Sequence, residues 1–159
     1  MYYKDEVEDK DRIVTGWGAS LSGIWQFAEN TSLCFQGVYG KGISNYIQDI
    51  SGSGLDLVPS ATAEGKLKAF NAWGGYIGFS HNWSKVLTSN IMYSYARVLD
   101  RYGMPATSYK YAQYAAANLF WDFSEYGSCA IEYVFGRRND FNKDYGNASR
   151  INTMIQYRF

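Results

Sequence analysis

The sequence is poor in the residues on which several common protein classes depend. Only two of its 159 residues are cysteine, one is histidine and two are proline. Cys34 and Cys129 are far apart and cannot form the dense disulfide framework of small secreted domains. The 15 Lys and Arg residues are balanced by 15 Asp and Glu residues, so the chain lacks the basic surplus on which nucleic-acid binding depends. We therefore expect neither a disulfide scaffold nor a nucleic-acid partner.

Long apolar runs are missing as well. A helix that spans a membrane needs about 18 or more consecutive apolar residues, and polar residues interrupt every apolar stretch of this chain within a few positions. Residues 1–12 are strongly charged and contain no apolar segment like that of a secretory signal peptide. A membrane-spanning helix is therefore excluded, and the N-terminal segment taken alone argues against export.

Aromatic residues, in contrast, are abundant. They make up 18% of the chain, with 15 Tyr, 9 Phe and 5 Trp. This content excludes a disordered chain, favours β-strands and includes the two side chains that prefer membrane–water interfaces. The combination is typical of a transmembrane β-barrel.

Hydrophobic periodicity also predicts an all-β fold. Apolar and polar residues alternate with period two through about seven segments, which is typical of strands with one apolar face. The expected strands cover residues 13–28, 32–39 or 32–46, 68–83, 86–99, 108–123, 128–138 and 150–159.

The connections between these strands alternate in length. Residues 29–31, 84–85 and 125–127 form short turns, whereas residues 48–67, 100–107 and 139–149 form longer connections. Outer-membrane barrels have short periplasmic turns and longer extracellular loops. Placing the short turns in the periplasm puts the C-terminus there and the start of the chain outside.

An odd strand count predicts an incomplete barrel, because single-chain bacterial barrels have an even number of strands. We therefore expect an antiparallel transmembrane β-barrel segment over residues 13–159, the C-terminal part of a larger porin barrel, with residues 1–12 as the remnant of an extracellular loop. An N-terminal half of the barrel would then be missing from this chain.

Several segments resemble one porin family. These are Thr15–Gly23 (TGWGASLSG), Ala72–Tyr76 (AWGGY), Tyr93–Ala96 (YSYA), Ala112–Leu119 and Glu132–Arg138 (EYVFGRR). Together they resemble the DcaP-like outer-membrane porins over residues 10–159. The resemblance implies a bacterial outer-membrane location, a homotrimer of large single-chain porins, and passage of dicarboxylates or other small organic anions.

The last ten residues, which end in Phe159, resemble the assembly signal of outer-membrane proteins. This resemblance implies that the outer-membrane assembly machinery is a partner of the chain.

In each predicted strand, alternate residues form two sets, and one of these sets carries most of the aromatic rings. The residues of the other set are candidates for the wall of a water-filled lumen. Cations outnumber anions among them, and the guanidinium fork of Arg suits carboxylates. We therefore expect a preference for anionic solutes, with the alternative that these charges pair with one another or with the rest of the barrel and only keep the wall hydrated. The candidate pore-lining residues are Tyr76, Lys110, Tyr114, Asp122, Glu132, Arg138, Arg150 and Arg158, accompanied by Asn118 and Gln156.

Two further features leave alternatives open. The loop 48–67 either folds inward and constricts the lumen or lies exposed on the surface. His81 and Ser89 lie on the same outward face across a hairpin, but the sequence offers no third group to orient a catalytic pair.

The glycine-rich segments lack the Gly-Lys-Ser/Thr of a phosphate loop, and no Cys, His or carboxylate cluster has metal-ligand spacing. We expect no enzyme activity, metal or cofactor.

The sequence thus predicts an outer-membrane porin segment of a Gram-negative bacterium, embedded in a lipid bilayer, that allows small hydrophilic solutes to diffuse passively. Two alternatives remain. One is a soluble, lipocalin-like barrel that binds a small ligand, in which the ring-rich face would point inward. The other is a non-functional remnant of a truncated porin.

Overall fold

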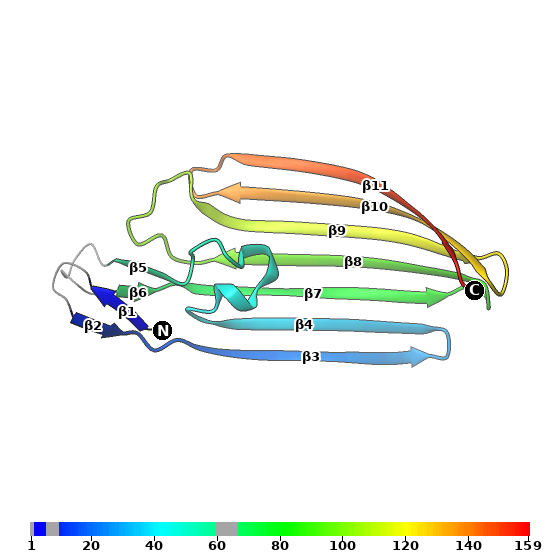
Figure 1. Cartoon of the computed structure of the whole chain (residues 1–159), viewed down its shortest axis with the longest axis horizontal. Coiled ribbons are helices and arrows are strands. Elements are labelled where there is room, and N and C mark those ends of the chain that lie inside the picture. Colours follow the sequence, from blue (N-terminus) through cyan, green and yellow to red (C-terminus); the bar gives the residue numbers. More distant parts are fainter. Residues whose placement is uncertain (1, 6–9, 60–66) are drawn as a thin grey trace.

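The main feature of the fold is a single curved sheet of seven antiparallel strands (Figure 1). The computed structural model describes residues 2–5, 10–59 and 67–159. The spatial order of the strands is β11-β10-β9-β8-β7-β4-β3, so the seven strands of this sheet lie side by side in the order in which they occur along the chain. The strands are β3 (Trp17–Ala28), β4 (Thr31–Lys41), β7 (Asn71–Asn82), β8 (Leu87–Val98), β9 (Tyr109–Asp122), β10 (Gly127–Asp140) and β11 (Tyr145–Tyr157).

The strand count and the all-β class expected from the sequence are confirmed. The short turns join β3 to β4, β7 to β8 and β9 to β10 at one end of the sheet, here called the turn end, where the C-terminus also lies (Figure 1). The other connections lie at the opposite end, here called the loop end. Each strand has 11 to 14 residues, and about 9 to 11 tilted residues cross a bilayer.

Two predicted boundaries are wrong. The strand predicted over residues 68–83 begins at Asn71, because Leu67–Ala69 pairs with Leu57–Pro59 instead of with the sheet. Residues 139–149 were expected to form a polar loop, but β10 continues to Asp140 and β11 begins at Tyr145. Backbone pairing extends to Asn139 and Tyr145. Strands pair through backbone hydrogen bonds, which do not require apolar side chains, so polar residues can continue a strand. The hydropathy pattern therefore locates the end of the apolar surface and not the end of the strands.

Short elements accompany the sheet. Strands β1 (Tyr2–Asp5) and β2 (Lys10–Ile13) pair with each other within the charged N-terminal segment, and β5 (Leu57–Pro59) pairs with β6 (Leu67–Ala69). Two 3-10 turns, η1 (Ser44–Tyr46) and η2 (Gln48–Ile50), follow β4. No helix in the described residues is long and apolar enough to cross a membrane.

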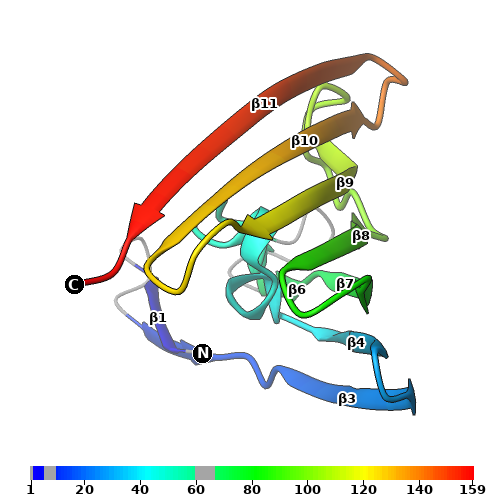
Figure 2. The ribbon, with the colours of Figure 1, turned by 90° about the vertical axis from the view of Figure 1, so that its right-hand side faces the viewer.

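The curvature gives the sheet a concave and a convex face, and the segment 42–56 lies on the concave side (Figure 2). Contacts place it there in detail. A Cβ atom at Gly18 would lie 3.0 Å from Cγ2 of Ile43, and one at Gly74 would lie 3.0 Å from Cγ2 of Ile47. Because side chains alternate along a strand, every residue that shares the parity of Gly18 and Gly74 on these strands faces the concave side.

A small hydrophobic core joins this inward segment, here called the inner loop (residues 42–56), to the loop end of the sheet. Ile50 and Val98 are completely buried, and Phe70 is 1% exposed. Polar anchors surround the core, because the Ser44 N–H donates to Asp56 Oδ1 at 2.7 Å and the Phe70 N–H donates to the Asp56 carbonyl at 3.1 Å. The core contains Ile43, Ile47, Ile50, Leu55, Phe70, Ala72, Ala96, Val98 and Tyr109.

Candidate functional site

The register of the strands aligns polar side chains into one continuous row across the concave face. Each of the seven strands contributes one residue, and each residue is the cross-strand partner of the next. This polar row consists of Gln26, Ser32, Ser80, Asn90, Asn118, Glu132 and Asn152.

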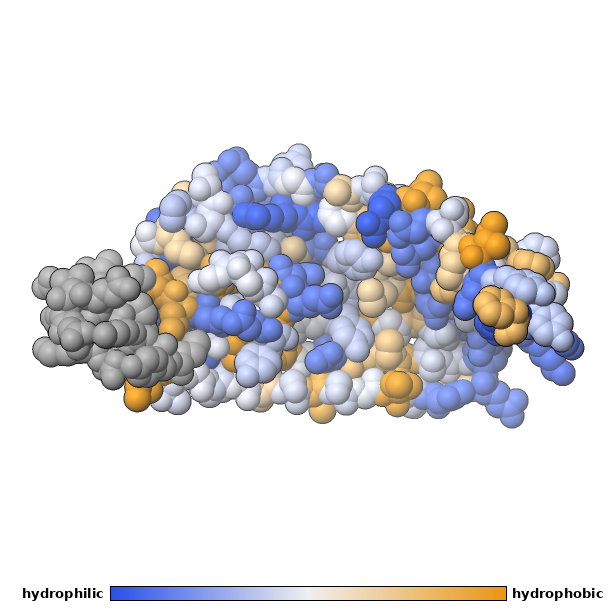
Figure 3. All heavy atoms as spheres, viewed as in Figure 1, coloured by the Kyte–Doolittle hydropathy of each residue, from blue (hydrophilic) through white to orange (hydrophobic). Residues whose placement is uncertain are grey.

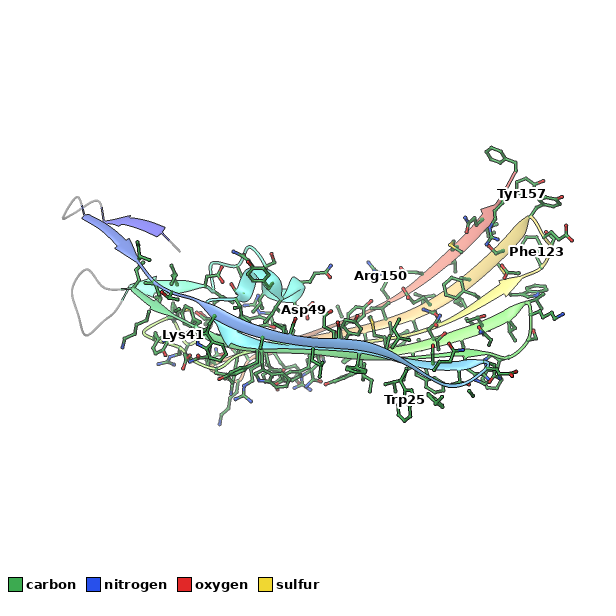
Figure 4. All side chains as sticks on the ribbon, turned by 90° about the horizontal axis from the view of Figure 1, so that it is seen from below. Trp25, Lys41, Asp49, Phe123, Arg150 and Tyr157 are labelled. Carbon is green, nitrogen blue, oxygen red and sulfur yellow. The ribbon has the colours of Figure 1, made fainter. Side chains whose placement is uncertain are left out.

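The neighbouring row on the convex face has the opposite character. Its seven members are also successive cross-strand partners, and none is charged. This apolar row consists of Trp25, Leu33, Phe79, Ile91, Ala117, Tyr133 and Ile151. At the same height along the strands, the sheet is therefore polar on the concave side and apolar on the convex side. Figure 4 shows Arg150 and Trp25 on these two opposite sides.

Hydrogen bonds connect four of the seven residues of the polar row. Asn90 Nδ2 donates to Asn118 Oδ1 at 2.8 Å, and the Asn90 backbone N–H donates to the same oxygen at 3.2 Å. Asn118 Nδ2 and Asn152 Nδ2 donate to the two carboxylate oxygens of Glu132 at 3.4 and 2.9 Å. Amide donors satisfy a carboxylate that lies half-buried in the wall. The network fixes four side chains from four adjacent strands.

The predicted pore-lining cations differ in how they are held. Arg138 Nε lies 2.9 Å from Asp140 Oδ1, and its guanidinium lies 5.6 Å from the Tyr109 ring centroid. Lys110 Nζ lies 6.0 Å from the ring centroid of Phe141, at the loop end. Arg150 lies on the concave face. The structure leaves the Arg150 guanidinium exposed and outside any ion pair of the described residues.

The remaining predicted residues lie near the two ends of the sheet. Asp122 is the last residue of β9, and Arg158 follows β11, where its backbone N–H donates to the Tyr126 carbonyl at 2.8 Å. Tyr76 and Tyr114 share the concave face with Glu132 and line a hollow next to the inner loop. The predicted residues therefore lie on one wall but do not converge on one point.

The inner loop narrows the concave side at the loop end. A hollow of about 570 Å³ lies between it and the sheet, lined by Asp49, Tyr46, Tyr76 and Tyr114 among others. A second hollow of about 700 Å³ brings Asp49 to the same space as Arg138. The exposed face of the loop is polar although its other face is packed in the core. Hydrophilic side chains spread across the middle of the side seen in Figure 3.

Aromatic rings form two bands on the convex face. At the loop end, Trp17 contacts Tyr39, and Trp73, Tyr95 and Tyr111 stack in succession with centroid distances of 4.8 and 5.5 Å. At the turn end, a second chain of contacts runs from Trp25 through Phe27 and Phe79 to His81 and Trp83. The apolar row starts at the second band. Two aromatic bands on an apolar surface match the two interfaces of a bilayer.

His81 and Ser89 are cross-strand partners, as their shared parity suggested. Each makes a hydrogen bond elsewhere, because His81 Nδ1 bonds Thr31 Oγ1 at 2.8 Å and Ser89 Oγ accepts from the Trp83 indole N–H at 2.9 Å. No group of three or more His, Cys, Asp or Glu side chains that could hold a metal ion occurs within the described residues.

Near the loop end and outside the long strands, burial raises the pKa of Tyr102, and the negative charge of Asp100 raises it further. Asp100 also accepts from the backbone and side-chain amide of Asn71 at 2.9 and 2.7 Å. These contacts fasten the connection between β8 and β9 to the start of β7.

Comparison with known proteins gives a match at the level of structure. No protein-family model matches the chain, and no curated protein matches it by sequence. The crystal structure of the outer membrane channel DcaP of Acinetobacter baumannii superimposes with a TM-score of 0.77 over 99% of this chain at 20% identity. The chain has the fold of part of an outer-membrane channel. It covers 44% of the DcaP chain, less than half of its length. The resemblance inferred from the sequence segments is thus confirmed for the fold.

Sequence reasoning missed some members of the site. Asp49 lies in the loop 48–67, for which the sequence leaves open an inward fold or surface exposure without indicating this residue. Asn90 and Asn152 lie on the predicted wall face but are not among the predicted pore-lining residues. Alternation within one strand shows the face of a residue. It does not show which residue of the next strand lies opposite, so the continuity of the polar row was not visible in the sequence.

Proposed function

We propose that the chain forms part of the wall of an outer-membrane channel through which small hydrophilic solutes diffuse passively, with a preference for anions. The observation that carries the proposal is the pair of aligned rows. Seven polar residues face the concave side where seven apolar residues face the convex side. This arrangement suits a wall between hydrocarbon and water, because lipid-facing charges cost about 2–4 kcal/mol at mid-membrane depth.

The inner loop supports passage that is restricted by size. It packs against the concave face by an apolar core and turns Tyr46 and Asp49 toward the remaining space. A loop held in this way narrows the passage at one end, so pore width and lining charge together would set selectivity.

Anion preference rests on Arg150, since Arg138 has a carboxylate partner and Glu132 has amide partners. An exposed guanidinium in a narrow aqueous passage presents a planar set of donors to a carboxylate. Its field is stronger there than on an open surface, because low-dielectric walls focus it.

Closure of the channel requires a partner. The edge strands β3 and β11 both run from the loop end to the turn end, so they cannot close on each other in an antiparallel ladder. Open edges leave backbone groups unpaired in lipid. A complementary sheet with an odd number of antiparallel strands would satisfy both edges. We infer that this sheet is the other part of the barrel, that the assembled porin is trimeric, and that the assembly machinery reads the strand ending in Phe159.

The lipocalin-like alternative finds no support in the curvature. It requires the ring-rich face to line the interior, whereas Trp25 lies on the convex side with the apolar row (Figure 4). The remnant alternative predicts a chain that folds but passes no current. We propose that the protein is a channel wall and not an enzyme.

Planar-bilayer recording of the chain refolded in the closed barrel that it forms with the complementary sheet tests the proposal. We expect stepwise conductance and, under a salt gradient, a reversal potential that shows anion preference. Removing both cations with Arg150→Gln and Arg138→Gln should lower the anion-to-cation permeability ratio. The control Lys85→Gln removes an exposed charge from the turn after β7.

Two results would contradict the proposal. Folded protein that shifts its gel migration on heating but gives no conductance steps would support the remnant. A reversal potential that the arginine substitutions leave unchanged would remove the anion preference and leave only the channel.

A further inference from the structure

The polar row contains one charged residue, Glu132, and its two neighbours in the row hold both carboxylate oxygens. Asn152 Nδ2 donates to Oε1 at 2.9 Å and Asn118 Nδ2 donates to Oε2 at 3.4 Å. Asn118 is itself fixed, because its Oδ1 accepts two hydrogen bonds from Asn90. The two asparagines that bond Glu132 are called here the amide clamp.

Arg150 lies one step along the wall from this clamp. It pairs in register with Val134, while Asn152, two residues further along β11, pairs with Glu132. Arg150 and Glu132 are therefore diagonal neighbours on the same face, about 7–8 Å apart at their Cα atoms, which long side chains can bridge. The other carboxylate of β10, Asp140, lies at the end of the strand and is paired with Arg138.

The expected outcome for such a diagonal pair is an ion pair, but none joins Arg150 to Glu132 among the described residues. Instead the carboxylate faces amide donors, and the guanidinium of Arg150 stays exposed. Along β10 and β11 the wall thus contains Arg138, which is paired with a carboxylate, and Arg150, which is not.

We propose that Asn118 and Asn152 are positioning residues that hold Glu132 away from Arg150 and so keep the Arg150 guanidinium available to anions. The inference rests on the proposed channel function and names the residues that maintain its anion preference. Without the amide donors, the carboxylate would recover its lost hydrogen bonds by turning to Arg150. Arg150 would then lose its free donor fork, and the local positive charge would be cancelled.

Reversal potentials test this by a cycle of variants. The double variant Asn118→Ala/Asn152→Ala should lower the anion-to-cation permeability ratio by about twofold to fivefold, the range expected when one exposed ion pair forms. Adding Glu132→Gln should restore the ratio, because no carboxylate remains to pair with Arg150. In an Arg150→Gln background, the asparagine substitutions should have no effect.

A second measurement does not require a conducting channel. Arginine-specific modification by phenylglyoxal, followed residue by residue with mass spectrometry, should be fast at Arg150 in the folded wild-type chain. It should slow by a similar factor in the asparagine double variant and recover when Glu132→Gln is added. Asn147→Ala is the matched control, because it removes an asparagine of the same strand from the opposite face.

Each outcome has a distinct meaning. The positioning role is wrong if the asparagine substitutions change neither the permeability ratio nor the modification rate. It is also wrong if they change these two quantities by the same factors with Glu132 present as with Glu132→Gln. Absence of conductance with the expected modification pattern would overturn the channel and retain the clamp.

Discussion

At the scale of single residues, the concave wall depends on side chains that are small or held in place. Gly74 is an example, because a Cβ atom there would approach Ile47 Cγ2 to 3.0 Å and the Tyr95 carbonyl to 3.3 Å. Its backbone does not have a positive φ, so the reason for glycine here is the close approach of the inner loop. The missing side chain lets Ile47 reach the strand.

Gly74→Val should therefore displace the inner loop at a cost of about 1–3 kcal/mol, the usual range for overpacking. We expect faster protease cleavage within residues 44–56 of the folded protein, measured by mass spectrometry of the fragments. Gly37→Val is the matched control, since no atom lies within 4 Å of a Cβ at that position. Equal cleavage of both variants would show that contact with Gly74 does not hold the loop.

At the scale of elements, the inner loop is held by a core of its own, and its two ends make backbone hydrogen bonds to Phe70, the residue before β7. Ile50 is completely buried in this core and Ile47 is 6% exposed, whereas Tyr46 is 81% exposed. The loop is thus amphipathic over a few residues, and the buried isoleucines fasten it to β7 and β8 through Ala72, Ala96 and Val98.

Ile50→Ala should loosen the loop without unfolding the sheet. Truncation of a buried isoleucine costs roughly 2–5 kcal/mol, and this cost falls on a small local core. We expect hydrogen exchange to speed up in residues 44–56 and to stay unchanged in β9 to β11. Tyr46→Ala serves as the control because its side chain contributes little to the core. Exchange that accelerates throughout the strands would mean that loop and sheet unfold together.

At the scale of the whole molecule, the two faces of the sheet differ in the side chains that they expose. Large apolar side chains remain exposed on the convex face, among them Ile155 at 85% and Ile131 at 51%. Exposed apolar surface of this extent marks a surface that meets lipid or another protein.

Spin labels at positions 119, 131 and 155 should therefore report an acyl environment in the assembled protein. Labels at Ser94 and Ala148, which have the concave parity, should report water. The experiment uses a variant in which Cys34 and Cys129 are replaced, and it measures accessibility to oxygen and to a polar relaxation agent. Aqueous values at the first three positions would remove the basis of the transport proposal.

Much of this architecture was readable from the chain alone. The alternation in residues 71–82 or 109–122 was visible because side chains of a strand point to opposite faces in turn, whatever lies beside it. The rhythm of connection lengths was visible because two-residue and three-residue turns have a characteristic composition. The parity of Glu132, Arg138 and Arg150 followed from the same local rule.

Only the tertiary structure decided what lies beside what. The register places Asn118 and Asn152 on either side of Glu132, and residues 14 and 20 positions away in sequence leave no local trace of such contacts. The inward fold of residues 42–56 depends on apolar surfaces from separate strands, so composition alone left it undecided. The sequence by itself determined the two faces of each strand, because that is a property of the backbone. The curvature and the lateral alignment determined which face encloses space, because those arise from packing between strands.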